Sequence, residues 1–144
     1  MTEARNVFGF HYFRLARHLW EFMLIRMRQL GAETLYVPVL WRAHEFEESR
    51  FDFTGIANPN RDIIGVLDLC AAMDFPVILD LTPGPITNAN LLHDGIPAWL
   101  LKKHPEIRAK NEQGETQTRC TFEHTTFQQY VTRWLEQFHQ AVYG

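Results

Sequence analysis

Four side chains with binding chemistry lie within five residues of one another. Trp41, Arg42, His44 and Glu45 follow residues 34–40 directly, and that apolar run reads as a buried strand. An indole, a guanidinium, an imidazole and a carboxylate together provide an aromatic surface, charge, and hydrogen-bond donors and acceptors. In parallel sheets, ligands bind beyond the carboxyl ends of the strands. The sequence therefore predicts a ligand-binding edge at this position.

The same loop contains three carboxylates, at Glu45, Glu47 and Glu48. Paired carboxyl groups can act as a general acid and a general base, so these residues could be read as a catalytic cluster. Adjacent side chains on an extended loop, however, do not converge on one point. A solvated loop is the better interpretation, and we assign no catalytic residue in this chain.

Strand-like and helix-like segments alternate along the sequence. Apolar and β-branched runs bounded by turn residues predict the strands, and apolar residues recurring every three or four positions predict the helices. The predicted order is strand 7–13, helix 19–30, strand 34–40, helix 63–73, strand 76–80, a short helix 97–102 and helix 125–143. Residues 106–120 are charged and are predicted to be irregular. Such alternation favours parallel strands joined by right-handed crossovers.

The first predicted helix carries a row of bulky apolar residues that should form one buried face, and Gly31 follows in the position that commonly closes a helix. The residues expected on that face are Leu19, Trp20, Met23, Leu24, Met27 and Leu30. The fold class is therefore α/β. A doubly wound sheet and a (β/α)8 barrel both begin with such units, so periodicity alone leaves the two architectures open.

Composition argues against several kinds of partner. A formal net charge of -3 and a sequence pI of about 6.1 give no basic field for nucleic acid or an anionic membrane. Cys70, Cys120 and the seven histidines show no metal-ligand or redox spacing, and no phosphate-binding loop occurs, so we expect no metal or cofactor. Residues 1–8 lack the pattern of a secretion signal, and no apolar run has membrane-spanning length. A soluble, cytoplasmic protein is expected.

Five segments in the same order resemble the amino-terminal part of glycoside hydrolase family 35, the β-galactosidases. They read HYFRLARHLWEFMLIRMRQLG, YVPVLWRAHE, FDFTG, VILDLTPGP and GIPAWLL. Residues 97–115 are also similar to the related family 42. The resemblance implies a glycosidase with a (β/α)8 barrel, and residues 1–144 would be the amino-terminal part of that catalytic domain, with about three βα units. It also implies that the substrate is a terminal β-galactoside or a similar carbohydrate, hydrolysed with retention.

The same resemblance places both catalytic carboxylates outside this chain. In the family, the general acid/base Glu follows the fourth strand and the nucleophilic Glu follows the seventh, and neither position occurs within 144 residues. Retaining hydrolysis requires two carboxyl groups about 5 to 5.5 Å apart. We therefore expect an amino-terminal fragment that is inactive when isolated.

Positions that contact sugar in the family can be matched residue by residue. The family's tyrosine at the end of the second strand aligns with Pro38, and Tyr36 faces the same side two residues earlier. Tyr36 could reach the sugar or could equally be a core tyrosine. Counting back from Gly95, Asn88 matches a cysteine and Asn90 matches the glutamate that binds a galactose hydroxyl. Both asparagines could instead satisfy turn backbone.

The residues around Trp41 follow the family pattern best. Trp41 could stack against a pyranose ring, while His44 or Glu45 holds a hydroxyl group. In the alternative, Trp41 covers the top of the barrel and Glu45 pairs with Arg14 or Arg42. The residues expected to support this face from the first strand are His11 and Arg14.

Two other functions remain open from the sequence. The chain could be a non-catalytic carbohydrate-binding or interaction module, as Trp41, Asn88 and Asn90 suggest. It could also be a truncated product without a role of its own. An open parallel edge after the third strand would then expose backbone groups and favour self-association.

Overall fold

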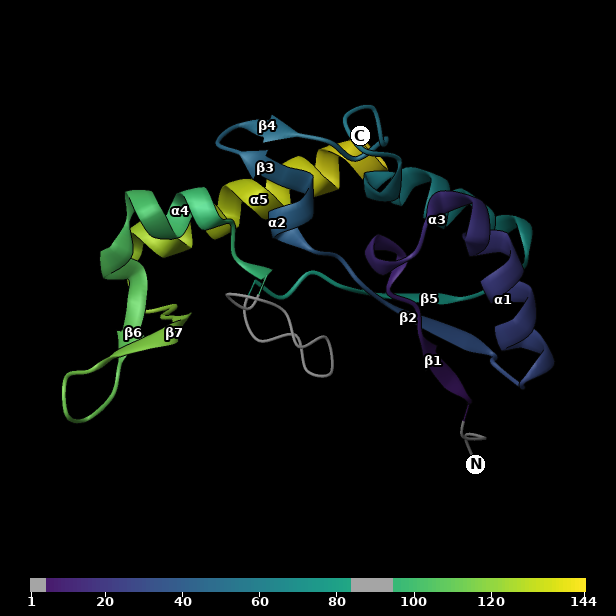
Figure 1. Ribbon diagram of the computed structural model, residues 1–144, viewed down its shortest axis with the longest axis horizontal. Helices are drawn as coiled ribbons and strands as arrows, with labels where there is room; N and C mark the ends of the chain where they lie inside the picture. Colours follow the sequence, from purple (N-terminus) through teal and green to yellow (C-terminus); the bar gives the residue numbers. More distant parts are fainter. Residues whose placement is uncertain (1–4, 84–94) are drawn as a thin grey trace. The chain divides into compact units, whose positions relative to one another are not determined.

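The computed structural model describes residues 5–83 and 95–144 (Figure 1). The chain divides into two compact units, each assembled from two separate stretches. The sheet unit comprises Met1–Val39 and Asp52–Asp80, and the helical unit comprises Leu40–Phe51 and Leu81–Gly144.

Three parallel strands form the centre of the sheet unit. They are β1 (Val7–Gly9), β2 (Thr34–Pro38) and β5 (Val77–Asp80), in the order β1-β2-β5. Tyr36 in the central strand lies opposite Gly9 on one side and Ile78 on the other. The three predicted strands are confirmed, and so is their parallel arrangement.

The central strand β2 is almost entirely buried. Leu35 and Val37 are fully buried, Pro38 is buried, and Tyr36 alone within β2 is partly exposed. Because strand side chains alternate, Leu35 and Val37 point to one face of the sheet and Tyr36 and Pro38 to the other. A strand covered on both faces must be apolar throughout, which explains its near-continuous apolar sequence.

The first strand is shorter than predicted. Pairing was expected over residues 7–13, but β1 ends at Gly9. The N–H group of Phe10 still donates to the Tyr36 carbonyl over 2.8 Å, and the chain then turns into a 3-10 helix at Tyr12–Arg14. Aromatic residues are common in strands, but they are also common at buried positions outside strands. The aromatic residues after Gly9 belong to the second case, because Tyr12 is fully buried.

Helices α1 (Trp20–Gln29) and α3 (Ile63–Ala72) are neighbours and lie on one side of the strands (Figure 1). Trp20, at the start of α1, is buried as predicted, but Leu19 and Leu30, which flank the helix, are 39% and 71% exposed. The expectation of burial was wrong for these two residues. Helical geometry places both about a quarter of a turn away from Trp20, on a neighbouring face. Gly31, with φ of 97°, follows the helix as expected.

Helix α3 begins at a cap formed by a buried carboxylate. Asn58 caps the short 3-10 helix Pro59–Arg61, and Asp62 then caps α3 by accepting a hydrogen bond from the Gly65 N–H over 2.8 Å. The second oxygen of Asp62 pairs with the Arg17 guanidinium at 2.7 Å. One side chain thus starts α3 and ties it to the segment preceding α1.

A second buried carboxylate, Asp52, organises the turn formed by residues 54–58, which leads towards α3. Its two oxygens accept hydrogen bonds from the five backbone N–H groups of residues 54–58, at 2.7 to 3.2 Å. Burial alone would raise the pKa of this carboxyl group. The hydrogen bonds from four of these N–H groups outweigh burial and hold the pKa below its ordinary value.

The helical unit contains the longest described helix, α5 (Thr125–Tyr143). Phe127, Trp134 and Phe138 are buried along one of its faces, and the helix predicted for residues 125–143 is confirmed. Within residues 5–83 and 95–144, no helix combines the length and apolar character needed to cross a membrane. The predicted short helix is also present as α4 (Ala98–Lys103).

Two small antiparallel hairpins complete the helical unit. Helix α2 (Trp41–His44) leads into β3 (Glu45–Glu47) and β4 (Arg50–Phe51). The second hairpin joins β6 (Arg108–Lys110) to β7 (Thr116–Cys120).

The hairpin β6–β7 corrects the prediction that residues 106–120 are irregular. Its turn is closed by the Asn111 side chain, which accepts hydrogen bonds from the N–H groups of Gln113 and Glu115 at 3.0 and 2.8 Å. Gly114 adopts φ of 79°, which a side-chain-bearing residue rarely does. Turn geometry, not apolar alternation, therefore defines this hairpin.

Candidate functional site

The strand ends of the sheet unit bring together Tyr36 and a residue to which the sequence assigned no binding role, Asp80. Pro38 lies opposite Asp80 in the parallel register, so Tyr36 and Asp80 project from the same face of neighbouring strands. The Tyr36 hydroxyl donates a hydrogen bond to Asp80 Oδ2. Both side chains are partly exposed.

This contact fixes the protonation state of the phenol. The hydrogen bond to Asp80 is the main reason that the pKa of Tyr36 rises to about 12, with smaller contributions from burial and from the Asp80 charge. Tyr36 therefore remains a hydrogen-bond donor across the physiological range and holds the carboxylate in one orientation. The sequence signal for Asp80 was a single acidic residue ending an apolar strand, and its partner could not be read from spacing.

His11 and Arg14 follow the carboxyl end of β1. The His11 ring stacks on Phe13 with centroids 5.7 Å apart, and the Arg14 guanidinium lies 5.9 Å from the same phenyl ring. Burial, and then the nearby Arg14 charge, lower the pKa of His11. Both effects favour the neutral form of the imidazole. That these two residues support sugar binding stays a prediction.

Trp41 lies in the aromatic core of the helical unit. Its indole is 2% exposed and stacks on Trp134, with centroids 5.9 Å apart, and on Phe127 at 6.4 Å. His44 is also fully buried and stacks on Trp134 at 6.2 Å. An indole packed in this way offers no open face to a sugar ring within this unit, so the structure favours the structural alternative for Trp41.

Glu45 is fully buried and is surrounded by hydrogen-bond donors. Its carboxylate accepts a hydrogen bond from Trp41 Nε1 at 2.7 Å and from the Ser49 N–H at 2.9 Å, and it pairs with the Arg133 guanidinium. The expected partner was Arg14 or Arg42. The observed partner comes from α5, 88 positions further along the chain. No local sequence pattern could have identified it.

A ring of contacts encloses the Arg133 guanidinium. It lies 4.9 Å from the Tyr130 ring and 5.8 Å from the Trp99 ring, and Trp99 Nε1 donates to the Glu45 carbonyl over 3.0 Å. Nearby, Lys103 binds both oxygens of Glu48 at 2.8 and 2.9 Å. These contacts join α4, α5 and the β3–β4 hairpin, and they make the Glu45 region a structural network.

The remaining predicted contacts with sugar, Asn88 and Asn90, lie outside the described residues. Of the other predicted residues, Tyr36, His11 and Arg14 belong to the sheet unit, and Trp41, His44 and Glu45 belong to the helical unit. The described ranges contain no group of three or more His, Cys, Asp or Glu side chains that could hold a metal ion.

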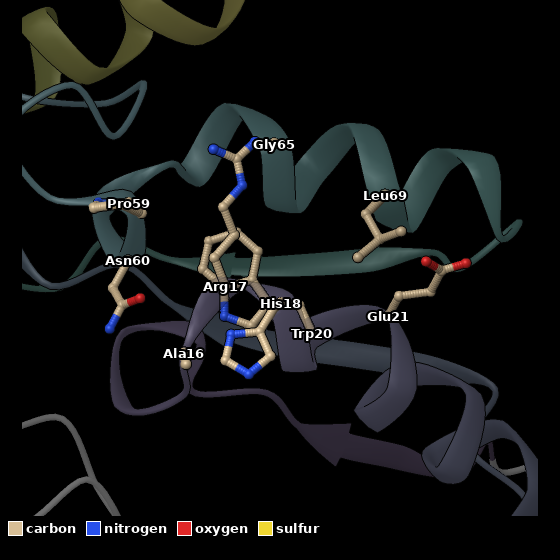
Figure 2. A pocket seen from close by; sticks show the side chains of 9 residues that line it. All are labelled: Ala16, Arg17, His18, Trp20, Glu21, Pro59, Asn60, Gly65 and Leu69. Carbon is tan, nitrogen blue, oxygen red and sulfur yellow. The ribbon is translucent and has the colours of Figure 1, made fainter.

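A groove of about 720 Å³ lies beside helices α1 and α3 of the sheet unit (Figure 2). Tyr36 is not among the residues that line it. Its lining residues come from the start of α1 and from the region of α3, and include Arg17, His18, Trp20, Asn60 and Leu69. Of these, Arg17 pairs with Asp62 at 2.7 Å. We assign no role in sugar chemistry to this groove.

Parallel strands followed by helices, with polar side chains at a strand end, define an α/β protein. The family model of the glycosyl hydrolases family 35 matches residues 7–143, and the chain belongs to that family. The resemblance drawn from the five sequence segments is thereby confirmed.

Individual relatives match the chain over a small part of their own length. An exo-β-D-glucosaminidase of Pyrococcus horikoshii is 37% identical over 131 residues, which is 88% of this chain and 17% of that protein. A β-galactosidase of Mus musculus is 36% identical over 93 residues, or 65% of this chain and 13% of the relative. The chain thus spans only 17% and 13% of the length of these two relatives.

Among solved structures, a polyextremophilic β-galactosidase from the Antarctic haloarchaeon Halorubrum lacusprofundi superposes with a TM-score of 0.78. The two are 17% identical, and the match covers 96% of this chain and 19% of the other. At this identity the likeness concerns the fold.

Proposed function

We propose that this chain forms the first three strand-helix units of a (β/α)8 barrel in a glycoside hydrolase. The family match over residues 7–143 is the observation that carries this proposal. The parallel order β1-β2-β5, with a helix after each strand, supports it. In such barrels the substrate lies at the carboxyl ends of the strands, which is where Tyr36 and Asp80 project.

The reaction proposed for the complete barrel is hydrolysis of a terminal β-glycoside with retention. One carboxylic acid protonates the leaving oxygen while a second carboxylate attacks the anomeric carbon. By the family resemblance, these groups belong to the fourth and seventh strands, outside residues 1–144. Residues 1–144 would supply contacts to the sugar, with Tyr36 as the first candidate and Asn88 and Asn90 as further ones.

Two substrates are candidates. The segments quoted from the sequence favour a β-galactoside. A β-D-glucosaminide is the second candidate, because the Pyrococcus glucosaminidase matches 88% of the chain and the mouse β-galactosidase only 65%. Asn90 also stands where the family has the glutamate that binds a galactose hydroxyl, and an amide cannot supply that charge.

A chimera provides a direct test. The 131 matching residues of the Pyrococcus exo-β-D-glucosaminidase would be replaced by the corresponding residues of this chain, and hydrolysis of chromogenic β-D-glucosaminide and β-D-galactoside would be measured. We expect turnover by the chimera and a lower rate in its Tyr36→Phe variant. A folded chimera whose rate is unaffected by Tyr36→Phe would show that Tyr36 does not serve the sugar site.

The 144-residue polypeptide alone should give no turnover with either substrate. Carboxylate-dependent release of the chromophore by the purified polypeptide would contradict this expectation, because it would require two catalytic carboxyl groups within these residues.

A non-catalytic carbohydrate-binding module remains the alternative from another class. It predicts sugar-induced NMR shifts in the 144-residue polypeptide and an inactive chimera. Self-association through the edge of β5, where Ile78 is 49% exposed, is a separate proposal. Sedimentation velocity tests it, and a monomer at all concentrations would exclude it.

A further inference from the structure

His11 lies on the same face of the sheet as Tyr36. The first strand, β1, ends at Gly9, and Gly9 is paired in register with Tyr36 of β2. Side chains at paired positions of neighbouring parallel strands project to the same face. Gly9 has no side chain, and His11 Nε2 lies 3.8 Å from the position that a Cβ atom of Gly9 would take. The imidazole therefore reaches back over the end of β1, on the face that carries Tyr36.

The imidazole is held by its ring face, which leaves its edge for other contacts. The ring stacks on Phe13, with centroids 5.7 Å apart and ring planes 17° from parallel. Within residues 5–83 and 95–144, neither imidazole nitrogen has a hydrogen-bond partner, and His11 is partly exposed. Both nitrogens lie on the edge of the ring. They can therefore form hydrogen bonds with a ligand while the stack on Phe13 is kept.

The protonation state of His11 indicates which kind of ligand group its edge can bind. Burial, and then the charge of Arg14, lower the pKa of the imidazole, so the neutral form is favoured. A neutral imidazole presents one hydrogen-bond donor and one acceptor. A hydroxyl group can likewise donate and accept, so it fits either nitrogen. The edge of His11 is thus suited to a neutral hydroxyl group, of which a sugar carries several.

We propose that His11 belongs to the sugar site and forms a hydrogen bond with one hydroxyl group of the terminal sugar. This inference rests on the proposed glycosidase function and adds a direct contact from β1 to it. Phe13 would hold the ring in place, and the missing side chain of Gly9 leaves room for it on the Tyr36 face. The alternative is that the His11 ring only packs against Phe13.

The chimera with the Pyrococcus exo-β-D-glucosaminidase allows a test, because the relative supplies the rest of the enzyme. Two variants separate the hydrogen bond from the packing. His11→Phe keeps an aromatic ring to stack on Phe13 but removes both nitrogens, and His11→Ala removes the ring as well. His18→Phe is the matched control, because His18 is exposed at the start of α1 and lies outside the strand ends. Circular dichroism will show whether each variant is folded.

We expect His11→Phe and His11→Ala both to lower kcat/KM by about threefold to tenfold, the range that one neutral hydrogen bond spans. His18→Phe should keep the parent value. Substrates that each lack one hydroxyl group of the terminal sugar then identify the contact. With one of them, the parent chimera should lose about the same factor, and His11→Phe should cause no further loss, because the two changes remove the same hydrogen bond.

A binding measurement on the 144-residue polypeptide provides a second readout. In an NMR titration with methyl β-galactoside and with glucosamine, the ring protons of His11 should shift, and those of His18 should stay in place. If no chimera folds, this titration decides the question, and unshifted His11 resonances at saturating sugar concentration would contradict the inference.

The possible failures can be told apart. An active chimera in which His11→Phe keeps the parent rate and His11→Ala loses it would show that the ring only packs against Phe13. Equal losses from His11→Phe with every hydroxyl-deficient substrate would exclude a hydroxyl contact. In both cases the proposed glycosidase function stands and the inference is wrong. A folded chimera that cleaves neither substrate would contradict the proposed function, and the inference would fail with it.

Discussion

Replacing Arg133 with methionine should destabilise the helical unit because it leaves Glu45 buried without a cation. Methionine retains an apolar stem of similar reach, so the change mainly removes charge and hydrogen bonds. Glu45 is fully buried, and among the described residues its carboxylate also accepts hydrogen bonds from Trp41 Nε1 and from the Ser49 N–H. Breaking a buried ion pair by removing one partner typically costs about 3 to 5 kcal/mol.

The expected loss lies at the lower end of that range. Arg133 is 29% exposed, so solvent already screens part of the pair, and two hydrogen-bond donors to Glu45 remain. Screening reduces the ionic part to about 2 kcal/mol. Loss of the contact between the guanidinium and the Tyr130 ring, at 4.9 Å, adds about 0.5 to 1 kcal/mol. We therefore expect a decrease of about 3 kcal/mol in the free energy of unfolding.

Urea unfolding followed by tryptophan fluorescence measures this change, because Trp41 and Trp134 stack within the same network. Arg50→Met is the matched control. Its pair with Glu47 is about 60% exposed on both sides, so its loss should cost less than about 0.5 kcal/mol. Equal destabilisation by the two arginine variants would refute the reasoning, as would a Glu45→Gln/Arg133→Met cycle with no coupling energy.

Three further predictions concern the sheet unit. The lowered pKa of Asp52 means that its stabilising effect is complete above the ordinary value of 3.8 and is lost as the pH falls through the native value, so Asp52→Asn should flatten acid unfolding measured by circular dichroism. Gly65→Ala would place a Cβ atom 2.3 Å from Asp62 Oδ2 and displace the helix cap, which should cost about 1 to 2 kcal/mol in urea unfolding. The hydrogen bond from Tyr36 to Asp80 makes its full contribution to stability below the ordinary tyrosine pKa of 10.0. That contribution is lost as the pH rises through about 12. Spectrophotometric titration should therefore show a late-ionising tyrosine signal that Tyr36→Phe reduces by one group.

The local sequence pattern was sufficient to predict elements that are buried along their whole length or whose buried residues recur at a regular interval. The strand β2 could be predicted because both of its faces are covered, and α5 because Phe127, Trp134 and Phe138 recur on one helical face. The first helix shows the limit of this reasoning. Its apolar residues spread over neighbouring faces, and spacing alone could not tell that Trp20 would be buried and Leu30 exposed.

Contacts made by polar groups were harder to predict than the elements that carry them. The β6–β7 hairpin depends on a turn closed by Asn111, which leaves no apolar period in the sequence. The partner of Glu45 depends on how α5 packs, 88 positions away. In both cases the sequence supplies the hydrogen-bonding groups, and only the tertiary arrangement determines which of them meet.

The two carboxylates near predicted strand ends show why residue type does not identify a binding site. Glu45 follows the second strand and resembles the family pattern. Its carboxylate, however, pairs with Arg133 and accepts hydrogen bonds from Trp41 and Ser49 in the interior of the helical unit. Asp80 ends the third strand without a matching motif, yet it is partly exposed and accepts a hydrogen bond from the Tyr36 hydroxyl. The sequence pattern therefore pointed to the buried carboxylate, and only the register of β2 and β5, which places Tyr36 and Asp80 on one face of the sheet, identifies the partly exposed one.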